Sequence, residues 1–574
     1  MEYAAIHHDM EKRDCYALEK GTFLFRLRAK KGDLQRVVIH YQDKYLPLRL
    51  LDTRRQVEME KVAADFCRDY YEAVIEMDVV CLRYFFELQD REGKVSYYGN
   101  HSFFPEKITD IDRMFDCPQN LREEEMFHVP DWAANKIVYQ VFPARFASSR
   151  EVPGDRWYKS PIGRDDDLQG DLRGLIRRLE HLRELGADIL YLNPIFTSRS
   201  VHKYDTVDYY RVDPSFGTNE DLGELVHRAH ALGLRVILDG VFNHTSPQFF
   251  AFSDILEKQE ASPYCGWYYI QSFPVRFARR YEKPVYKCFS YFGGMPKVNL
   301  RNPEARQYFL DVARYWTQQY AIDGWRLDVG DEVSHEFWKE FRRLVRSVNP
   351  QALIVGEVWH YAGDFLEGDE WDTIMNYTFW LAVKDFVASE SISASQFLER
   401  LEFLRGNLHR KACPILWNLI GSHDTPRFLQ LCGGRREKLK LAAALQLLLP
   451  GMPVIYYGDE YGMSGGQDPD CRRGMVWDAE YQDAEMYRWY RRLIQVRKTC
   501  PCLTEGRRVE QTADDARGVI SLTLCKDGQA LTVCFHGKDG TAALPELAGR
   551  EELLTGKPFA GALGPYEAAV LRNR

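Results

Sequence analysis

Eight apolar segments alternate with helix-like segments between residues 137 and 460, and this alternation constrains the fold more than any other feature. Each segment is apolar throughout rather than at every second position, which is typical of strands buried on both faces. Helices between such strands indicate a parallel sheet, and eight parallel strand–helix units close a TIM barrel. The segments are IVYQVFP, ILYLNPI, LRVILDGVFNH, GWRLDV, ALIVGEVW, TIMNY, ILWNLIGSHD and PVIYYGDE. The sequence therefore predicts an α/β protein built on a (β/α)8 barrel.

Two of the connecting segments carry clear helix signals. Apolar residues in LRGLIRRLEHLRELG follow the helical period, and Gly186 is the expected stop. In NEDLGELVHRAHALG, Asn219 is the expected N-cap and Gly233 the expected end. Each segment is predicted to form one helix.

The remaining segments predict three additions to the barrel. Residues 1–125 carry β-like runs such as RVVIHY and CLRYFFELQ, with a hairpin turn at 90–93, and are expected to form a small all-β domain. The catalytic barrel is assigned to residues 126–497. It contains an inserted subdomain at about 245–300, after the third strand, because that stretch is too long for an ordinary loop. Residues 498–574 are expected to form a C-terminal β-domain.

Charge and composition exclude several classes of function. The net charge of −8 is spread along the chain without a basic stripe, so DNA and RNA are not expected partners. No apolar run approaches the ~20 residues of a membrane span, and the N-terminus lacks a stretch typical of a signal peptide. The 13 cysteines include no C-x-x-C, which argues against a disulfide framework or a zinc site. We expect a cytoplasmic protein with reduced thiols.

Polar residues follow the apolar segments at the positions where strands should end. They are Asp239, Asn243, His244, Arg326, Asp328, Glu357, His423 and Asp424. One charge at a strand end is often only a solvated loop residue. Parallel strands, however, bring all their carboxyl ends to one rim of the barrel, where TIM-barrel active sites lie. The sequence therefore predicts one site with several carboxyl groups.

Several carboxylates with an arginine and histidines, and no metal or cofactor motif, favour glycoside hydrolysis. Arg326 and Asp328 are two residues apart on a strand and should face the same side. A cation within about 4–6 Å lowers a carboxyl pKa, so we expect Arg326 to keep Asp328 ionised as the nucleophile. Glu357, on the next strand, is then the acid/base. Neighbouring strands lie about 4.7–4.9 Å apart, which suits the roughly 5–5.5 Å carboxyl separation of a retaining mechanism.

The segments DGVFNH, GWRLDV, GEVW and GSHD resemble, in this order, the four signature regions of the α-amylase family, glycoside hydrolase family 13. MPKVNL at 295–300, EVSHEFW and the N-terminal β-domain resemble the neopullulanase, cyclomaltodextrinase and maltogenic amylase branch. The resemblance covers essentially the whole chain. It implies Asp328 as nucleophile, Glu357 as acid/base and Asp424 as a third carboxylate that holds sugar hydroxyls.

The same resemblance implies a set of residues that bind sugar. Arg326, His244 and His423 would hold the glucose unit on the non-reducing side of the bond, and HKYDTVDYY would place His202 and Tyr204 against that sugar. Trp359 would be a platform for the leaving-side sugar. Arg427 is also counted among the substrate-binding residues.

Three departures from the family accompany the resemblance. Ala144 and Ser148 stand where oxygen ligands of a structural calcium would be expected, so no metal ligand is predicted and no cofactor is required. Gly330-Asp331 replaces the usual Ala-Asn, which leaves the balance of hydrolysis and transglycosylation open. Gly474 replaces the usual proline, which questions the rigidity of that loop.

The expected activity is retaining hydrolysis of α-1,4 bonds, with α-1,6 bonds as a further candidate, in cyclomaltodextrins, maltooligosaccharides or pullulan, with some transglycosylation. An oligo-1,6-glucosidase or a glucanotransferase on the same barrel is the enzyme alternative. A non-catalytic starch-binding scaffold is the alternative from another class, since fold does not fix function. The resemblance also implies a homodimer formed through the N-terminal domain.

Overall fold

The computed structural model describes residues 1–10, 13–46, 55–77, 79–100, 102–118, 126–278 and 282–573 of the 574-residue chain. Contacts divide the chain into two compact units. One comprises residues 1–128, 363–369 and 396–413, and the other comprises 129–362, 370–395 and 414–574. The predicted boundary at residue 125 falls outside the described residues. No described helix is long and apolar enough to cross a membrane.

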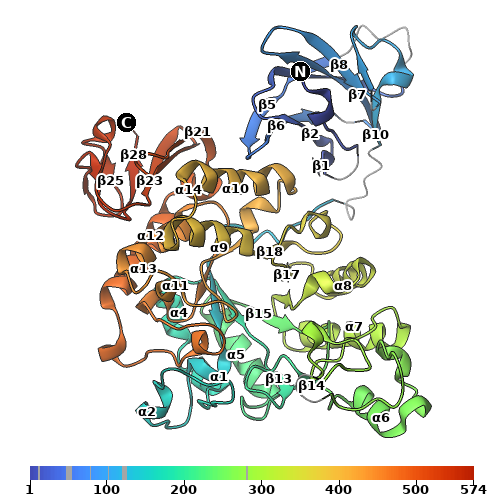
Figure 1. Ribbon diagram of the computed structural model, residues 1–574, viewed down its shortest axis with the longest axis vertical. Coiled ribbons are helices and arrows are strands. Elements are labelled where there is room, and N and C mark those ends of the chain that lie inside the picture. The colour runs from blue at the N-terminus through green and yellow to red at the C-terminus, as the bar shows by residue number, and fades with distance from the viewer. Residues whose placement is uncertain are drawn as a thin grey trace. The chain divides into compact units, whose positions relative to one another are not determined.

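Eight parallel strands of the second unit close into a barrel, as predicted (Figure 1). Closure is made by the first and last strands, which pair with Val138 opposite Val454. Every residue of seven of the strands is buried, which explains why they read as continuous apolar runs. The strands are β11 (Val138–Val141), β12 (Ile189–Leu192), β15 (Arg235–Gly240), β16 (Gly324–Leu327), β17 (Leu353–Gly356), β18 (Thr373–Asn376), β19 (Trp417–Leu419) and β20 (Met452–Tyr456).

The strand register places the predicted catalytic residues side by side. Arg326 on β16 lies opposite Asp239 on β15, and Leu327 lies opposite Gly356 on β17. Asp328 and Glu357 are the next residues of β16 and β17. Gly324 opens β16, and a Cβ there would meet the carbonyl oxygen of Leu353 at 2.1 Å, so only glycine permits this approach of the two strands.

The helices around the barrel differ from the predictions in two details. The predicted helix over 172–186 is two helices, α3 (Leu172–Ile176) and α4 (Leu179–Leu185), because Arg178 leaves the helical region (φ −109°, ψ 5°) and places its guanidinium over Trp477. α5 (Asn219–Ala231) is capped by Thr218, not Asn219, through a capping box with Asp221. The other long helices are α7 (Pro303–Gln319), α8 (His335–Val348), α12 (Arg436–Leu448) and α13 (Ala484–Thr499).

The described residues of the stretch between β15 and α7 include α6 (Phe250–Lys258) and three 3-10 turns. Isolated bridges tie it to the barrel rim, with His244 paired to Lys297 and Tyr268 to Val298. The limits of this insertion, about 245–300, remain a prediction.

The N-terminal unit has the predicted β-structure. β1 (Cys15–Glu19), β2 (Thr22–Lys30), β6 (Arg68–Glu76) and β5 (Glu60–Ala64) form one antiparallel sheet. β4 (Arg55–Glu58), β3 (Leu34–Asp43), β7 (Cys81–Asp90), β8 (Val95–Gly99) and β9 (Ser102–Phe104) form the other, where β10 (Phe115–Pro118) pairs with β7. The two sheets share one buried apolar core. The predicted hairpin at 90–93 joins β7 to β8.

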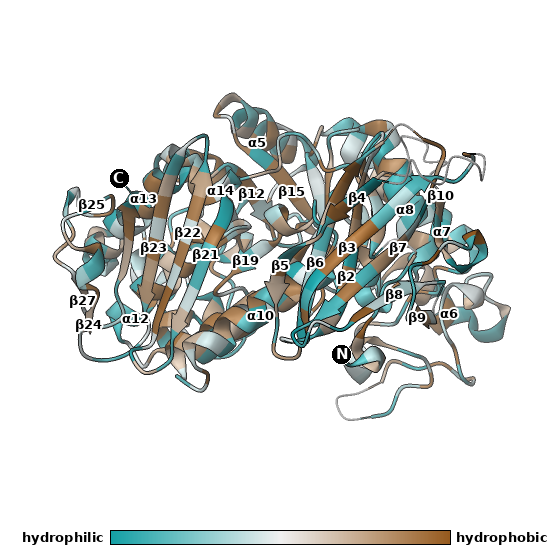
Figure 2. Cartoon of the chain, turned by 90° about the horizontal axis from the view of Figure 1, so that it is seen from above, coloured by the Kyte–Doolittle hydropathy of each residue, from teal (hydrophilic) through white to brown (hydrophobic). Residues whose placement is uncertain are grey.

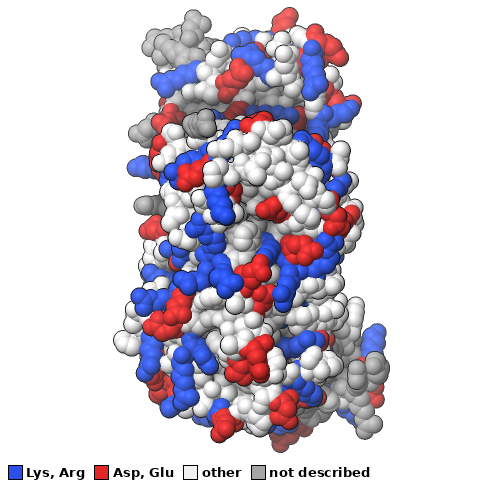
Figure 3. Space-filling view, turned by 90° about the vertical axis from the view of Figure 1, so that its left-hand side faces the viewer, with Lys and Arg blue, Asp and Glu red and all other residues white. Residues whose placement is uncertain are grey.

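The C-terminal residues form an antiparallel sheet, as predicted. Its edge strand β21 (Arg507–Asp514) is mostly hydrophilic, whereas β22 (Val519–Lys526) and β23 (Gln529–His536) are more hydrophobic (Figure 2). A polar edge strand discourages pairing with other chains. β28 (Ala568–Arg572), β25 (Glu551–Glu552) and β26 (Lys557–Pro558) complete the sheet. On the face shown in Figure 3, basic and acidic side chains are interspersed.

Candidate active site

A single buried arginine organises the carboxyl groups at the C-terminal ends of the strands. Arg326 Nη1 donates to Asp239 Oδ1 at 2.8 Å and to Asp328 Oδ1 at 2.9 Å. Its Nη2 lies 2.8 Å from Glu357 Oε2. Three carboxyl groups from three adjacent strands thus share one guanidinium, which is completely buried. Arg326 and Asp328 do face the same side, as their spacing predicted.

The backbone after Asp328 helps to hold Glu357. Val329 lies in the left-handed region (φ 45°, ψ 44°), which is a genuine outlier for a β-branched residue. In this conformation its N–H donates to Glu357 Oε2 at 2.9 Å. Trp359 Nε1 donates to the other oxygen, Oε1, at 3.2 Å. Both oxygens of Glu357 are therefore oriented by groups from the two strand ends.

Burial outweighs the arginine in setting the protonation of Asp328. Removal of Asp328 from water raises its pKa well above the ordinary value, and the charges of Glu357 and Asp239 add to this effect. The prediction that Arg326 would keep Asp328 ionised is therefore contradicted. Arg326 opposes the shift and so favours the carboxylate form that a nucleophile needs.

Asp424 lies in a positive environment. His423 Nε2 is 2.9 Å from Asp424 Oδ2, and Arg472 Nη2 donates to Oδ1 at 3.1 Å. Burial by itself would raise the pKa of Asp424, but His423 and Arg472 outweigh it and hold the pKa below the ordinary value. Asp424 is thus ionised and can accept hydrogen bonds.

Neutral polar groups fix the orientation of His423. Gln140 Nε2 and Asn193 Nδ2 lie 2.9 and 3.2 Å from its Nδ1, so Nδ1 accepts and Nε2 can carry the proton. Tyr204 stacks on the imidazole at a centroid distance of 5.4 Å, and its hydroxyl contacts Nε2 at 2.6 Å. Tyr204 is therefore part of the site, as predicted.

The other two predicted histidines are neutral. Burial lowers the pKa of His202 to about 4 and that of His244 to about 3. His244 stacks on Phe289 at 5.2 Å, and its buried Nε2 has no hydrogen-bond partner among the described residues. Such an atom is suited to bind a substrate hydroxyl.

These side chains border a cleft of about 370 Å³. Trp359 is 47% exposed and stacks on Tyr377 at 3.8 Å, so its outer face is open to a ligand. Arg326 and His423 lie beneath this lining and contact it. The lining residues are Arg164, His202, Tyr204, His244, Phe289, Met295, Asp328, Val329, Glu357, Trp359, Asp424, Asp468 and Arg472.

Arg427, predicted to bind substrate, has a structural partner and does not belong to the cleft lining. Its guanidinium is completely buried and binds Asp459 Oδ1 at 2.9 Å and the carbonyl oxygens of Tyr457 and Cys471. It does not line the cleft. Arg472, which sequence reasoning did not select, lines the cleft and binds Asp424 at 3.1 Å. Arg472 comes from a loop, not from a strand end, so the strand-end rule could not find it. Asp239 was collected at a strand end but was given no role.

The loop after β11 does not fit a calcium ion. Asp171, the acidic residue packed against it, accepts from the N–H and hydroxyl of Ser149 and from the N–H of Gly174. Its oxygens are thus used as a helix cap. Within the described ranges, no group of three or more His, Cys, Asp or Glu side chains could hold a metal ion. No step of the chemistry below involves a metal.

The other two departures from the family have structural consequences. Asp331 Oδ2 lies 3.1 Å from His360 Nε2, so this acid links the chain after Asp328 to the chain after Glu357. At Gly474, a Cβ would meet the carbonyl oxygen of Trp157 at 2.3 Å. Close packing therefore requires glycine here and restrains the loop, which answers the question that the missing proline raised.

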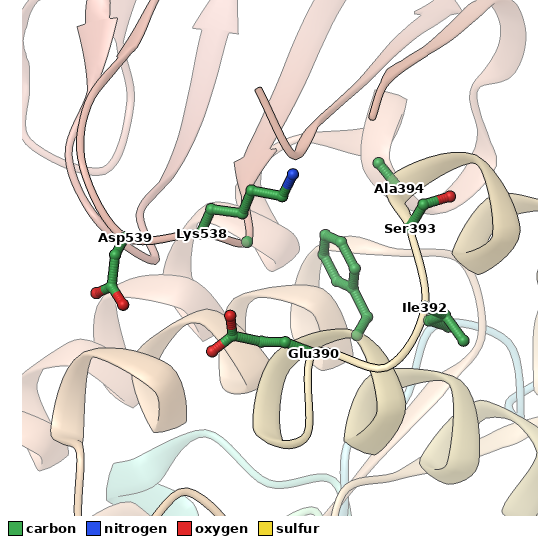
Figure 4. A pocket seen from close by; sticks show the side chains of 8 residues that line it. Glu390, Ile392, Ser393, Ala394, Lys538 and Asp539 are labelled. Atoms are coloured by element: carbon green, nitrogen blue, oxygen red, sulfur yellow. The ribbon is translucent and has the colours of Figure 1, made fainter. Parts of the chain in front are cut away.

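A second cavity, of about 290 Å³, lies between the segment after α9 (Tyr377–Val383) and the C-terminal sheet. Figure 4 shows Glu390 and Asp539 approaching it from these two sides. Here the two acids bind different cations: Glu390 binds Lys438 at 2.6 Å, and Asp539 binds Arg435 at 2.6 Å. Arg435 also binds Glu437 at 2.7 Å. We call this cavity the seam cavity. Glu390 and Asp539 do not share one guanidinium, unlike the acids of the cleft.

Comparisons with known proteins agree with this geometry. The family described as "Alpha amylase, catalytic domain" matches residues 140–506, and "Alpha amylase, N-terminal ig-like domain" matches 1–119. Neopullulanase 2 of Thermoactinomyces vulgaris is 40% identical over 99% of each chain. Intracellular maltogenic amylase of Bacillus subtilis is 36% identical over 93% of this chain and 91% of its own. A solved cyclomaltodextrinase structure has a TM-score of 0.90 at 35% identity, covering 100% of this chain and 98% of that chain.

Proposed function

This chain belongs to the α-amylase family, and from this premise we propose that its cleft hydrolyses α-glucans with retention of configuration. The chain is a glycoside hydrolase of the neopullulanase, cyclomaltodextrinase and maltogenic amylase type. The observation that carries the proposal is the arrangement of Asp328 and Glu357. They end adjacent parallel strands and contact the same guanidinium of Arg326.

In the first step, Asp328 attacks the anomeric carbon and Glu357 gives its proton to the glycosidic oxygen. The carbon–oxygen bond breaks, the leaving sugar departs as an alcohol, and an ester forms between Asp328 and the remaining sugar. In the second step, Glu357 removes a proton from water, the water oxygen attacks the anomeric carbon, and Asp328 leaves as a carboxylate.

The surrounding groups support this charge movement. Arg326 stabilises Asp328 as a carboxylate at the start and end of the cycle, because the guanidinium remains charged throughout. Ionised Asp424 accepts hydrogen bonds from sugar hydroxyls. Neutral His244 and His202 can bind hydroxyls without adding positive charge beside the developing oxocarbenium ion. Trp359 supplies a flat apolar surface for the leaving sugar.

We propose cyclomaltodextrins, maltooligosaccharides and pullulan as substrates, cleaved at α-1,4 bonds and also at α-1,6 bonds, with some transfer to sugar acceptors. The printed names of the relatives support this range. The name "intracellular maltogenic amylase" and the free thiols support a cytoplasmic location. We also propose a homodimer formed through the N-terminal domain, which light scattering of the purified protein would test.

The proposal is tested by reducing-sugar release from β-cyclodextrin, pullulan and soluble starch. We expect the fastest turnover on the cyclic substrate. NMR observation of the first product should detect the α-anomer before mutarotation. A folded sample without activity on any α-glucan would contradict the proposed function, and the β-anomer as first product would contradict retention.

A further inference from the structure

A strained turn borders the cleft. The 3-10 turn η7 (Phe289–Tyr291) places Ser290 and Tyr291 in the left-handed region, with φ of 49° and 58°. This conformation is disfavoured for serine and tyrosine, because their Cβ comes too close to the backbone. Backbone hydrogen bonds hold it in place: Phe289 N–H donates to Met295 O at 3.0 Å, and Met295 N–H donates to Phe292 O at 3.0 Å. The backbone hydrogen bonds of the insertion therefore stabilise the turn, although serine and tyrosine disfavour its left-handed conformation.

The strained turn directs three aromatic side chains to different surroundings. Phe289 lines the cleft and stacks on His244, and Met295, at the other end of the turn, also lines the cleft. Tyr291 is 88% exposed, the highest value for a large apolar side chain in the described ranges, and Phe292 is 53% exposed. Two adjacent exposed aromatic rings at the edge of a binding cleft are unusual unless they bind something.

We propose that Tyr291 and Phe292 form an outer sugar-binding platform, which we call the rim platform. It binds glucose units of substrates that extend beyond the cleft. A pyranose ring has an apolar face of C–H groups that packs on an aromatic ring, and the tyrosine hydroxyl can bond to a sugar hydroxyl. Continuity of the turn with the cleft, through Phe289 and Met295, identifies the ligand as the same α-glucan chain. This inference rests on the proposed function and extends it to substrate size.

The rim platform should affect large substrates, which extend beyond the cleft, more than small ones. Maltoheptaose and β-cyclodextrin are large enough to contact both the cleft and its rim, whereas maltotriose fills only the units next to the scissile bond. Loss of the Tyr291 ring should raise KM for the large substrates about tenfold, with kcat changed less than twofold. The values for maltotriose should stay within twofold of the wild type.

Tyr291→Asn is the most informative variant, because asparagine tolerates the left-handed conformation and removes only the ring. Tyr291→Phe keeps the ring and should retain wild-type KM, whereas Phe292→Ala should show a smaller increase. Phe66→Ala, which removes an exposed ring from the N-terminal unit, is the matched control and should change neither value. Calorimetry should find the melting temperature of Tyr291→Asn within about 2 °C of the wild type.

Two outcomes would overturn the inference. One is an unchanged KM for both large substrates in Tyr291→Asn. The other is an equal loss on maltotriose, which would mean that the turn only shapes the cleft. A change in molar mass by light scattering, with substrate kinetics unaffected, would instead assign the two rings to an interface between copies of the chain. Inactivity of the wild type on every α-glucan is a different result, which contradicts the proposed function itself.

Discussion

The catalytic cleft and the seam cavity have similar volumes, about 370 and 290 Å³, and both contain carboxylates and basic groups. They differ in how the carboxyl groups are paired. In the seam cavity, Glu390 and Asp539 bind different cations, Lys438 and Arg435, which hold both pKa values below the ordinary value. In the cleft, Arg326 is shared by Asp239, Asp328 and Glu357, and burial raises the pKa of Asp328. Cavity size alone would not distinguish the two sites.

The largest effect should come from removal of a carboxylate at the shared arginine. Asp328→Asn should lower kcat/KM on β-cyclodextrin by roughly 10⁴-fold, because the nucleophile is lost. Reducing-sugar release measures this loss. Residual activity within tenfold of the wild type would mean that another group attacks the anomeric carbon.

The same variant should not be less stable near neutral pH. The folded pKa of Asp328 is raised, so its contribution to stability is lost as pH rises through that value, and asparagine does not titrate. The melting temperature of Asp328→Asn should therefore equal or exceed that of the wild type at pH 7 but not at pH 4. A lower melting temperature at pH 7 would show that Arg326 needs Asp328 for the fold.

Removal of the proton donor should have a smaller effect that depends on the leaving group. Glu357→Gln should lower kcat on maltoheptaose by about 10²–10⁴-fold, the usual range for general acid–base catalysis. An aryl α-maltoside with an acidic phenol needs little proton donation, so release of the phenol in the first step should fall far less. Equal losses on both substrates would assign the acid role to another residue.

Arg427 forms a structural ion pair with Asp459, which can be compared with the shared arginine of the cleft, Arg326. Arg427→Ala should destabilise the protein by about 1–3 kcal/mol, because the buried carboxyl of Asp459, whose pKa burial raises to about 7, would lose its partner. Denaturant unfolding measures this change. If the variant folds, KM for β-cyclodextrin should stay within twofold, and a large increase would return Arg427 to the substrate-binding set. Where Ala does not fold, Arg427→Lys serves the same comparison.

Acid should lower the stability of the folded protein, because His202 and His244 are buried in the neutral form. The folded pKa values of His202 and His244 are lowered to about 4 and 3, so the unfolded chain binds protons first as pH falls below 6.5. Each histidine then costs up to about 1.4 kcal/mol of stability per pH unit. His244→Gln should flatten the decrease in unfolding free energy between pH 6.5 and 4.5. An unchanged slope would mean that His244 is charged in the folded protein.

Substitution in the seam cavity should have the smallest effect on stability and activity. Glu390→Gln should cost about 0.5 kcal/mol or less, because its pair with Lys438 is partly exposed and screened by solvent. Its kcat/KM on β-cyclodextrin should match the wild type. A loss of activity comparable to that of Glu357→Gln would end the distinction between the two cavities.

The sequence was sufficient to predict the barrel and the central acids, because both depend on one regular pattern. Strands buried on both faces are continuously apolar, so their ends, and hence Asp328, Glu357 and Asp424, can be located by counting. Arg427 and Arg472 show the limit of this approach. Both lie in loops, and the direction of each side chain depends on contacts with distant parts of the chain, such as Asp459 for Arg427.

The pKa of Asp328 shows a second limit. The Arg-x-Asp spacing correctly predicted the contact with Arg326. The spacing could not indicate how deeply Asp328 is buried or how close Asp239 and Glu357 lie to it, because both depend on the packing of three strands. The break between α3 and α4 has the same origin, because Arg178 leaves the helix where it contacts Trp477, almost 300 residues later in the chain.

Position 329 is subject to two opposing demands, backbone stability and the orientation of Glu357, and selection experiments can tell them apart. Its left-handed backbone disfavours a β-branched residue, and glycine or asparagine would relieve that strain. Mutagenised libraries screened only for heat resistance should therefore accumulate glycine at position 329. Libraries screened for sugar release should keep a residue that holds the N–H against Glu357. The residue recovered at position 329 would therefore show whether a library had been selected for heat resistance or for sugar release.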